Sequence, residues 1–370
     1  MKKNLRMLLI MLAVLVVVGG GAAALGARAV LELLRGRDHG LRSGLQVVFA
    51  GSDLSTAAWQ NLCELLESRD FCVQILSRDG EDLPTAVTAR GLRWLLERRY
   101  GTEKARERVF VTTDATRGAL RALSVAEGYT TFNLPRNLEW DETPLCPGAL
   151  LAPAAAGVDV EAVLRGAASI RPMLEGRSFD NPAWLYAAGR TILARRGRRV
   201  EYLTSAEPDA WTLCRWWQRL FGGRGCLGGE GLLPAMAELP ADLPQLHQLL
   251  ADGAAPLVQT VVRFEPPEHR VPVEMDWQNL DHLNYLEGYT LDYVLDQVLA
   301  GAVQAGVDGG VPIVMMDCGP LAEETAGELL YFFELTSCLA AGMLGRDVYE
   351  AEEPAAWAAR AAELLGRPRD

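Results

Sequence analysis

Residues 8–34 read LLIMLAVLVVVGGGAAALGARAVLELL. The apolar run ends at Val18, three glycines follow at 19–21, and an alanine-rich segment continues to Leu34. A strand that is buried on both faces is apolar throughout, and a glycine turn can lead it directly into a helix. We therefore expect a β-strand at 14–18, a tight turn and a helix.

A membrane anchor is the alternative interpretation of the same region. No charged side chain occurs from 7 to 27, and Lys2, Lys3 and Arg6 precede this run. Such a pattern is typical of a signal anchor that is long enough to span a bilayer. We favour the strand because the glycines divide the run, so a membrane partner is expected only if 7–27 is an anchor.

Strand and helix patterns alternate along the rest of the chain. Strands are expected at 45–50, 71–76, 108–112, 129–134, 199–203, 256–264 and 311–316. Helices are expected at 52–68, 85–100, 118–128, 149–168, 183–195, 211–221, 281–305 and 323–344, the first capped by Ser52 or Asp53. This alternation predicts parallel βαβ units with helices on both faces of each sheet, and hence an α/β fold.

An irregular stretch near 172–182 suggests a domain boundary, because it contains Gly176 between two prolines. The expected organisation is a first αβα sandwich domain at 1–170, starting at the strand 14–18, and a second at 180–345. A C-terminal helical segment would occupy 346–370.

Composition limits the classes of partner and cofactor. The net charge of −12 argues against a nucleic-acid partner, which needs a basic surface. The seven cysteines are odd in number and never spaced as CxxC, so neither a disulfide framework nor a zinc site is indicated. The glycine turn is not a spaced GxGxxG, so a nicotinamide cofactor is not expected either. A cytoplasmic protein without cofactor fits best.

Several segments, in order and at compatible spacing, resemble bacterial glucose-6-phosphate isomerase. They include LGARA at 25–29, VTTDATRGAL at 111–120, NPAWLYAAGR at 181–190, WWQRLFG at 216–222 and LDHLNYLEGYTLDYV at 280–294. The resemblance implies two sugar-isomerase (SIS) domains, each an αβα sandwich with a parallel sheet. It also implies a homodimer, because the family's dimer completes the site and the N-terminal helices that help to cover the sheet are not found before the first strand.

The resemblance implies four catalytic groups whose positions hold other residues in this chain. The glutamate base corresponds to Gly223, the ring-opening histidine to Pro244, the enediolate-binding arginine to Asp141 and the last lysine to Ala358. Isomerisation requires a base within reach of the C2 proton and a positive group facing the developing oxyanion. We therefore expect impaired catalysis.

Glu230 and His247 are candidate substitutes for the acid and base. Glu230 lies in a glycine-rich loop, and the alternative interpretation is that it is an ordinary solvated acid of that loop. His247 lies among leucines, where an ordinary surface or core histidine is the alternative.

The sugar-phosphate pocket implied by the resemblance consists of Gly21, Ser77, Asp79, Gly80, Glu81, Asp82 and Gln248. In the family the loop at 77–82 supplies hydroxyl and amide donors, whereas three of its residues are acidic here. A carboxylate ~4 Å from a phosphate charge costs about 4 kcal/mol at a surface-like dielectric, so a sugar phosphate should bind weakly. The other interpretation of these acids is that they cap the following helix.

Three functions from different classes remain open. The first is a catalytically impaired homologue that binds a sugar or sugar phosphate or regulates another process. The second is an active aldose-ketose isomerase for glucose 6-phosphate, fructose 6-phosphate or a related sugar, with a relocated acid and base. The third is a membrane-anchored SIS module.

Overall fold

The computed structural model describes residues 14–41, 44–134, 144–224, 230–251, 256–347 and 356–366. The first part of the chain forms a five-stranded parallel sheet in the order β2-β1-β3-β4-β5. Its strands are β1 (Val14–Val18), β2 (Gln46–Ala50), β3 (Phe71–Leu76), β4 (Val109–Thr113) and β5 (Thr130–Asn133). The helices of this part are α2 (Ala22–Arg35), α3 (Thr56–Glu67), α4 (Leu83–Tyr100), α5 (Thr102–Arg106), α6 (Ala119–Glu127) and α7 (Leu151–Ala155), with a 3-10 turn η1 (His39–Leu41).

Strand β1 lies inside the sheet, between β2 and β3, and all five of its residues are buried. The strand interpretation of 14–27 is therefore confirmed, because Val14–Val18 is extended and helix α2 begins directly after the glycine turn. Within the described ranges, no helix combines the length and the apolar character that a membrane crossing requires.

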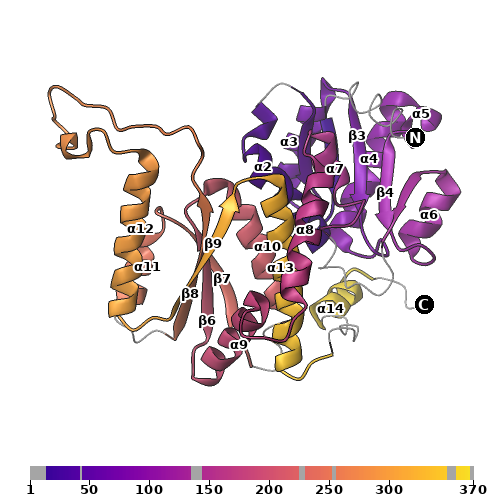
Figure 1. The fold of residues 1–370 in the computed structure, drawn as a ribbon. Helices are drawn as coiled ribbons and strands as arrows, with labels where there is room; N and C mark the ends of the chain where they lie inside the picture. The colour runs from indigo at the N-terminus through magenta and orange to yellow at the C-terminus, as the bar shows by residue number, and fades with distance from the viewer. Residues whose placement is uncertain are drawn as a thin grey trace.

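The second part of the chain forms a four-stranded parallel sheet in the order β7-β6-β8-β9. Its strands are β6 (Val200–Ser205), β7 (Leu233–Glu238), β8 (Leu257–Glu265) and β9 (Ile313–Pro320). The associated helices are α8 (Val160–Leu174), α9 (Pro182–Arg195), α10 (Trp211–Arg224), α11 (Leu243–Ala251), α12 (Leu291–Asp308), α13 (Glu323–Met343) and α14 (Ala356–Leu364), with 3-10 turns η3 (Pro208–Ala210) and η5 (Asn284–Leu286). Two parallel sheets with helical layers confirm the predicted α/β fold class (Figure 1).

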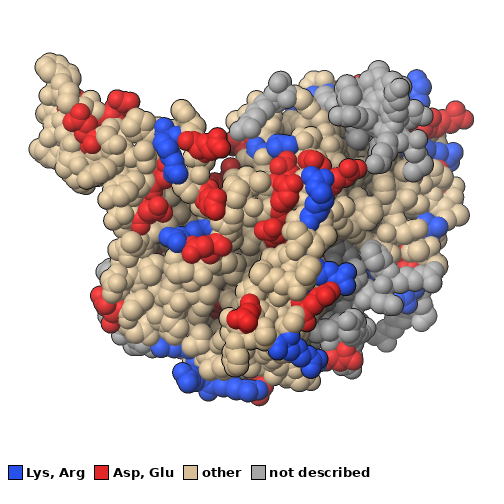
Figure 2. Space-filling model, in the orientation of Figure 1, with Lys and Arg blue, Asp and Glu red and all other residues tan. Residues whose placement is uncertain are grey.

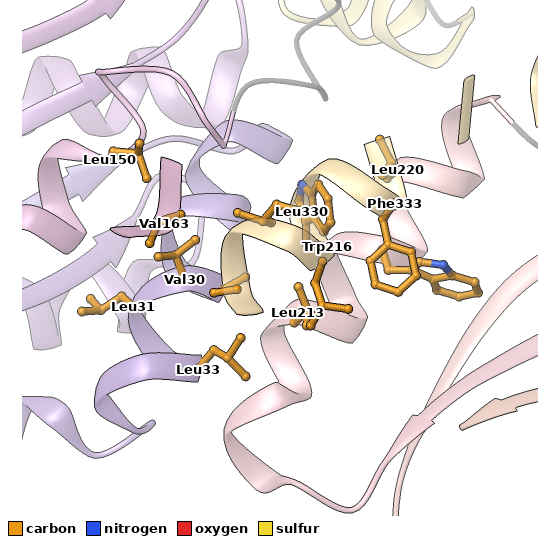
Figure 3. Close-up of a cluster of buried hydrophobic side chains, with 14 of the residues drawn as sticks. Val30, Leu31, Leu33, Leu150, Val163, Leu213, Trp216, Leu220, Leu330 and Phe333 are labelled. Atoms are coloured by element: carbon orange, nitrogen blue, oxygen red, sulfur yellow. The ribbon is translucent and has the colours of Figure 1, made fainter. Parts of the chain in front are cut away.

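Helices α2, α8, α10 and α13 lie between the two sheets and share one apolar core (Figure 1). Figure 3 shows this core, in which Leu33 of α2, Val163 of α8, Trp216 of α10 and Leu330 of α13 point toward one another. Helix α8 packs mainly against α13 and so joins this central layer. The domain limits at 170 and 180 stay a prediction.

Local departures from the sequence prediction have identifiable causes. Strand β7 was not expected, because Pro234 interrupts its apolar pattern. The strand lies at the edge of the sheet, where a proline does not remove a hydrogen bond between interior strands. The predicted helix at 149–168 is split into α7 and α8 by Gly157, whose φ of +87° ends α7. The cap of α3 is Ser55, whose side chain accepts a hydrogen bond from the N–H of Ala58, rather than Ser52 or Asp53.

The predicted helix at 281–305 is α-helical only from Leu291 onward. His282 has a φ of +60°, and the side-chain amide of Asn284 donates to the carbonyl of Asp276 at 2.8 Å. These local hydrogen bonds compete with helix formation. Residues 266–290 therefore form an irregular connection that projects from the molecule between β8 and α12 (Figure 1).

Candidate functional site

The site begins at the glycine turn Gly19–Gly21, which joins the carboxyl end of β1 to helix α2. The connection after β1 leads to its neighbour β2, whereas the connection after β3 leads to β4 on the opposite side, so the strand order reverses between β1 and β3. Ligands of open α/β sheets bind at such a switch point, outside the carboxyl ends of the strands. The loops after β1, β2 and β3 are therefore where a ligand is expected.

Thr85 of helix α4 connects these three loops. Its hydroxyl oxygen accepts a hydrogen bond from the backbone N–H of Gly20 at 2.8 Å and lies 3.2 Å from the carbonyl oxygen of Gly51. The carboxylate of Asp82 is hydrogen-bonded to the same hydroxyl and accepts the backbone N–H of Thr85 at 3.3 Å. The capping interpretation of Asp82 is thus confirmed, because this residue is the N-cap of α4.

The loop at 77–82 binds its own amides. The hydroxyl of Ser77, which is buried, accepts the backbone N–H of Gly80 at 3.0 Å. The carboxylate of Asp79 accepts the backbone N–H of Glu81 at 2.8 Å. An oxyanion in this loop would have to displace these side chains and would face their negative charge.

A cavity of about 540 Å³ lies on the other side of the glycine turn, toward β2 and α10. The turn itself, Arg28 of α2, and Arg215 and Arg219 of α10 line it. No acidic side chain is found among the described residues of its wall. The negative charge predicted for the site thus belongs to the loop at 77–82, whereas this cavity is lined by cationic side chains.

Arg28 is held by its neighbours on α2 and β2. Its Nε donates to the carboxylate of Glu32 at 2.6 Å, and its guanidinium lies 5.8 Å from the centre of the Phe49 ring. Glu32 is buried and also accepts the hydroxyl hydrogen of Thr212 at the start of α10. This contact fixes α2 against α10, and it sets the distance between the arginines of the two helices.

Comparison with known proteins agrees with this architecture. A glucose-6-phosphate isomerase of Staphylococcus saprophyticus is 37% identical over 344 residues, which cover 93% of this chain and 78% of that protein. The chain belongs to the glucose-6-phosphate isomerase family. A protein of the same name from Bacillus cytotoxicus is 35% identical over 350 residues, with the same coverage of 93% and 78%. No family model matches the sequence.

Solved structures show the same fold as this isomerase-family chain. A hypothetical protein from Thermus thermophilus superposes with a TM-score of 0.86 at 21% identity, covering 99% of this chain and 85% of that one. A glucose-6-phosphate isomerase from Chlamydia trachomatis gives a TM-score of 0.80 at 14% identity, covering 98% and 73%.

The positions that the resemblance assigns to catalysis lie on several elements of the structure. Gly223 lies near the end of α10, one helical turn after Arg219 and on the same face. Pro244 and Gln248 are exposed on α11, which packs against α12 on the far side of the second sheet from α2 (Figure 1). Of the candidates in the described ranges, Gly223 follows a cavity-lining arginine by one helical turn, but it is not itself part of the cavity wall.

The remaining candidates do not join this site in the described part of the chain. Ala358 lies half-buried on α14, and Asp141 falls outside the described residues. Glu230 is exposed in the segment before β7 and does not appear in the described wall of the cavity. His247 lies on α11, and its side chain is outside the description.

A buried polar network in the second part of the chain was missed by sequence reasoning. Arg190 forms an ion pair with Glu201, and their side chains are only 5% and 1% exposed. Glu201 also accepts hydrogen bonds from Tyr186 at 2.6 Å and Thr260 at 2.7 Å. Burial raises the pKa of the Tyr186 phenol, so it stays a hydrogen-bond donor. Tyr186 and Arg190 are four residues apart and therefore share a helix face. This spacing was the feature of the sequence that could have indicated the network.

Proposed function

We propose that this chain is a member of the glucose-6-phosphate isomerase family that binds a sugar phosphate without efficiently interconverting aldose and ketose. The observation that carries this proposal is Gly223. It follows Arg219 of the cavity wall by one turn of α10, corresponds to the base according to the family resemblance, and has no side chain that could accept a proton.

The other steps of isomerisation also lack their groups. Removal of the C2 proton creates an enediolate, which needs a facing cation, and ring opening needs an acid within hydrogen-bond reach. Pro244 and Ala358 cannot donate a proton, and Asp141 would repel the enediolate. The alternative acid and base, Glu230 and His247, belong to the segment before β7 and to α11. No described contact joins these two elements to the glycine turn.

A coupled assay of fructose 6-phosphate conversion tests the proposal, with the Staphylococcus saprophyticus isomerase as positive control. We expect turnover at least 10³-fold below that of the control, because a missing base and a missing oxyanion donor each cost about 10²-fold or more. Restoring only the base, Gly223→Glu, should leave turnover at background, because the other groups remain absent. Turnover comparable to the control would refute the proposal and revive the active isomerase.

We also propose a homodimer, supported by the projecting segment at 266–290. Trp277, Leu280 and Tyr285 of this segment are 83%, 77% and 73% exposed. Figure 2 shows the projection as mostly uncharged surface with a few acidic side chains. Several large apolar side chains exposed on one segment are typical of a protein interface. A second copy is the occupant that the family resemblance favours, since the resemblance implies that the family's dimer completes the site.

The proposed location is the cytoplasm. The six cysteines in the described part of the chain are free thiols, and free thiols persist where glutathione and thioredoxin keep proteins reduced.

A further inference from the structure

A second cavity, of about 560 Å³, lies between helices α8, α9 and α13 and the edge strand β9. Its wall is mainly apolar and includes Met173, Met315 and Met316. An apolar cavity of this size with a few polar groups is typical of a small-molecule site, and methionine side chains adapt to the shape of a ligand. In its described wall, no residue belongs to the loops at the switch point or to the positions that the resemblance assigns to catalysis.

The apolar wall is open to solvent. Met173, Leu185 and Met315 line the cavity and are all exposed. Apolar side chains that gather around one opening leave surface in water that a ligand could bury, and such places commonly mark binding sites.

Gly189 of α9 keeps the cavity open. Leu185, Gly189 and Leu193 follow one another at intervals of four residues, so they share the helix face that lines the cavity. Glycine destabilises a helix interior, yet no close packing requires it here, because a Cβ at this position would meet no atom within 4 Å. A larger side chain at 189 would therefore enter the cavity and reduce its volume.

The charges of the wall are compensated except at Glu328 of α13. The buried ion pair between α9 and β6 neutralises its own charges, and Asp317 is paired with Arg263 at 2.6 Å. Glu328 is half-buried. Among the described residues it accepts a hydrogen bond only from Ser169, at 3.3 Å, and has no cationic partner. This carboxylate gives the cavity a negative group beside its apolar wall.

A hydroxyl lies one helical turn before this carboxylate. Thr325 is buried, lines the cavity and has no hydrogen-bond partner among the described residues. Buried polar side chains normally have a partner, so this hydroxyl lacks one that a ligand could supply. Thr325 and Glu328 are three residues apart and share a face of α13. One donor group in the cavity could therefore bind both.

We infer that this cavity binds an amphiphilic amine, an apolar molecule that carries one protonated amino group. Its hydrocarbon part lies against the methionine and leucine side chains, and its ammonium group donates hydrogen bonds to the carboxylate of Glu328 and the hydroxyl of Thr325. An anionic amphiphile would instead face the same carboxylate and be repelled. The inference is independent of the proposed function, since the cavity shares no residue with the glycine turn.

Octylamine, octanol and octanoate have the same hydrocarbon chain and differ in the charge of the head group. Calorimetric titration of the full chain with each of them near neutral pH tests the inference. We expect octylamine to bind about tenfold or more tightly than octanol, and octanoate to bind more weakly than octanol. Equal affinity for the amine and the alcohol would overturn the role of the carboxylate. Tighter binding of octanoate, or no binding of octylamine, would overturn the site.

Glu328→Gln locates the head group. This variant should bind octylamine no more tightly than octanol, whereas its affinity for octanol should be unchanged. Glu324→Gln removes an exposed carboxylate of the same helix that is not part of the cavity wall, so it is the matched control and should keep the preference for the amine. A preference for octylamine that persists in Glu328→Gln would contradict the inference.

Gly189→Phe locates the hydrocarbon part. The new ring should occupy the cavity and weaken binding of octylamine and octanol about tenfold or more, while thermal stability is retained because phenylalanine is a better helix former than glycine. Gly342→Phe makes the same change at an unobstructed position of α13 outside the cavity wall and should bind normally. Unchanged binding in Gly189→Phe would overturn the site. A sedimentation mass changed by Gly189→Phe, with no octylamine binding by the unmodified protein, would instead identify a contact between copies and would also overturn it.

Discussion

The backbone N–H of Gly20 donates a 2.8 Å hydrogen bond to the hydroxyl oxygen of Thr85, 65 positions later in the chain. This bond ties the turn after β1 to the first turn of α4, and the same hydroxyl reaches the carbonyl of Gly51 after β2. The loops at the carboxyl ends of three neighbouring strands are thus held by one side chain. Their fixed positions give the arginine-lined cavity its shape.

Thr85→Val should destabilise the protein by about 1–3 kcal/mol, because the isosteric side chain leaves the N–H of Gly20 without its acceptor. Urea denaturation measures this as a lower midpoint with an unchanged slope. Thr102→Val, at an exposed position at the start of α5, is the control and should shift the midpoint little. Equal shifts in both variants would contradict the structural role of Thr85.

The crossing of α8 and α13 requires glycine at 327. A Cβ added there would collide with the carbonyl oxygen of Val163, which is backbone and cannot move aside easily. Gly327→Ala should therefore cost about 1–3 kcal/mol of stability. On the same helix, a Cβ at Gly342 meets no atom within 4 Å, so Gly342→Ala should be neutral or stabilising by up to about 1 kcal/mol. Thermal unfolding of both variants measures these changes in stability. A Gly327→Ala protein that is more stable than the unmodified protein would contradict the close crossing of α8 and α13.

The buried pair of Arg190 and Glu201 should be strongly coupled. Glu201→Gln leaves a guanidinium buried without its counter-charge and should cost about 3–5 kcal/mol. Arg190→Met should cost a similar amount, whereas the double variant should cost clearly less than the sum. Arg171→Met breaks the exposed pair with Glu175 and should cost less than ~1 kcal/mol. Additive effects at 190 and 201 would show that the ion pair does not form.

The buried thiols should be chemically silent in the native protein. Burial raises the pKa of Cys72 and of Cys214 to about 12, so neither forms the reactive thiolate near neutral pH. Iodoacetamide at pH 8 should modify both only after unfolding and should reach the half-buried Cys63 first. Since the native state holds these protons longer than the unfolded state, stability should fall as pH rises from about 9 toward 12. Mass spectrometry of labelled native protein checks the order, and early labelling of Cys214 would contradict its burial.

The proposed homodimer predicts a sedimentation mass of twice the 40.3 kDa chain at micromolar concentration. Trp277→Asp should shift the equilibrium toward monomer, because it places a charge in the apolar surface of the 266–290 segment. Phe179→Asp changes another exposed aromatic, 90% exposed in the connection before α9, and should leave the mass unchanged. A single-chain mass for the unmodified protein would rule the dimer out.

Much of the fold was predictable because strands buried on both faces have a distinctive composition. The six residues of β3 are all buried and were predicted at their observed limits, 71–76. Strand β7 could not be predicted in the same way: it is an edge strand, and its sequence LPAMAE lacks the continuous apolar run of an interior strand. The bend at 281–290 depends on hydrogen bonds between Asn284 and Asp276, which only the folded loop brings together.

The sequence by itself determined which chemical groups are missing. A glycine at 223 and an alanine at 358 cannot act as base or acid in any conformation. Only the tertiary structure decided which charged side chains lie close to one another. Asp79 and Asp82 belong to the loop at 77–82. Their carboxylates accept hydrogen bonds from the backbone amides of Glu81 and Thr85, which are close in sequence. Arg28 and Arg215 are far apart in sequence, yet packing of α2 against α10 brings them to one cavity, because side-chain proximity across helices depends on packing and not on sequence spacing.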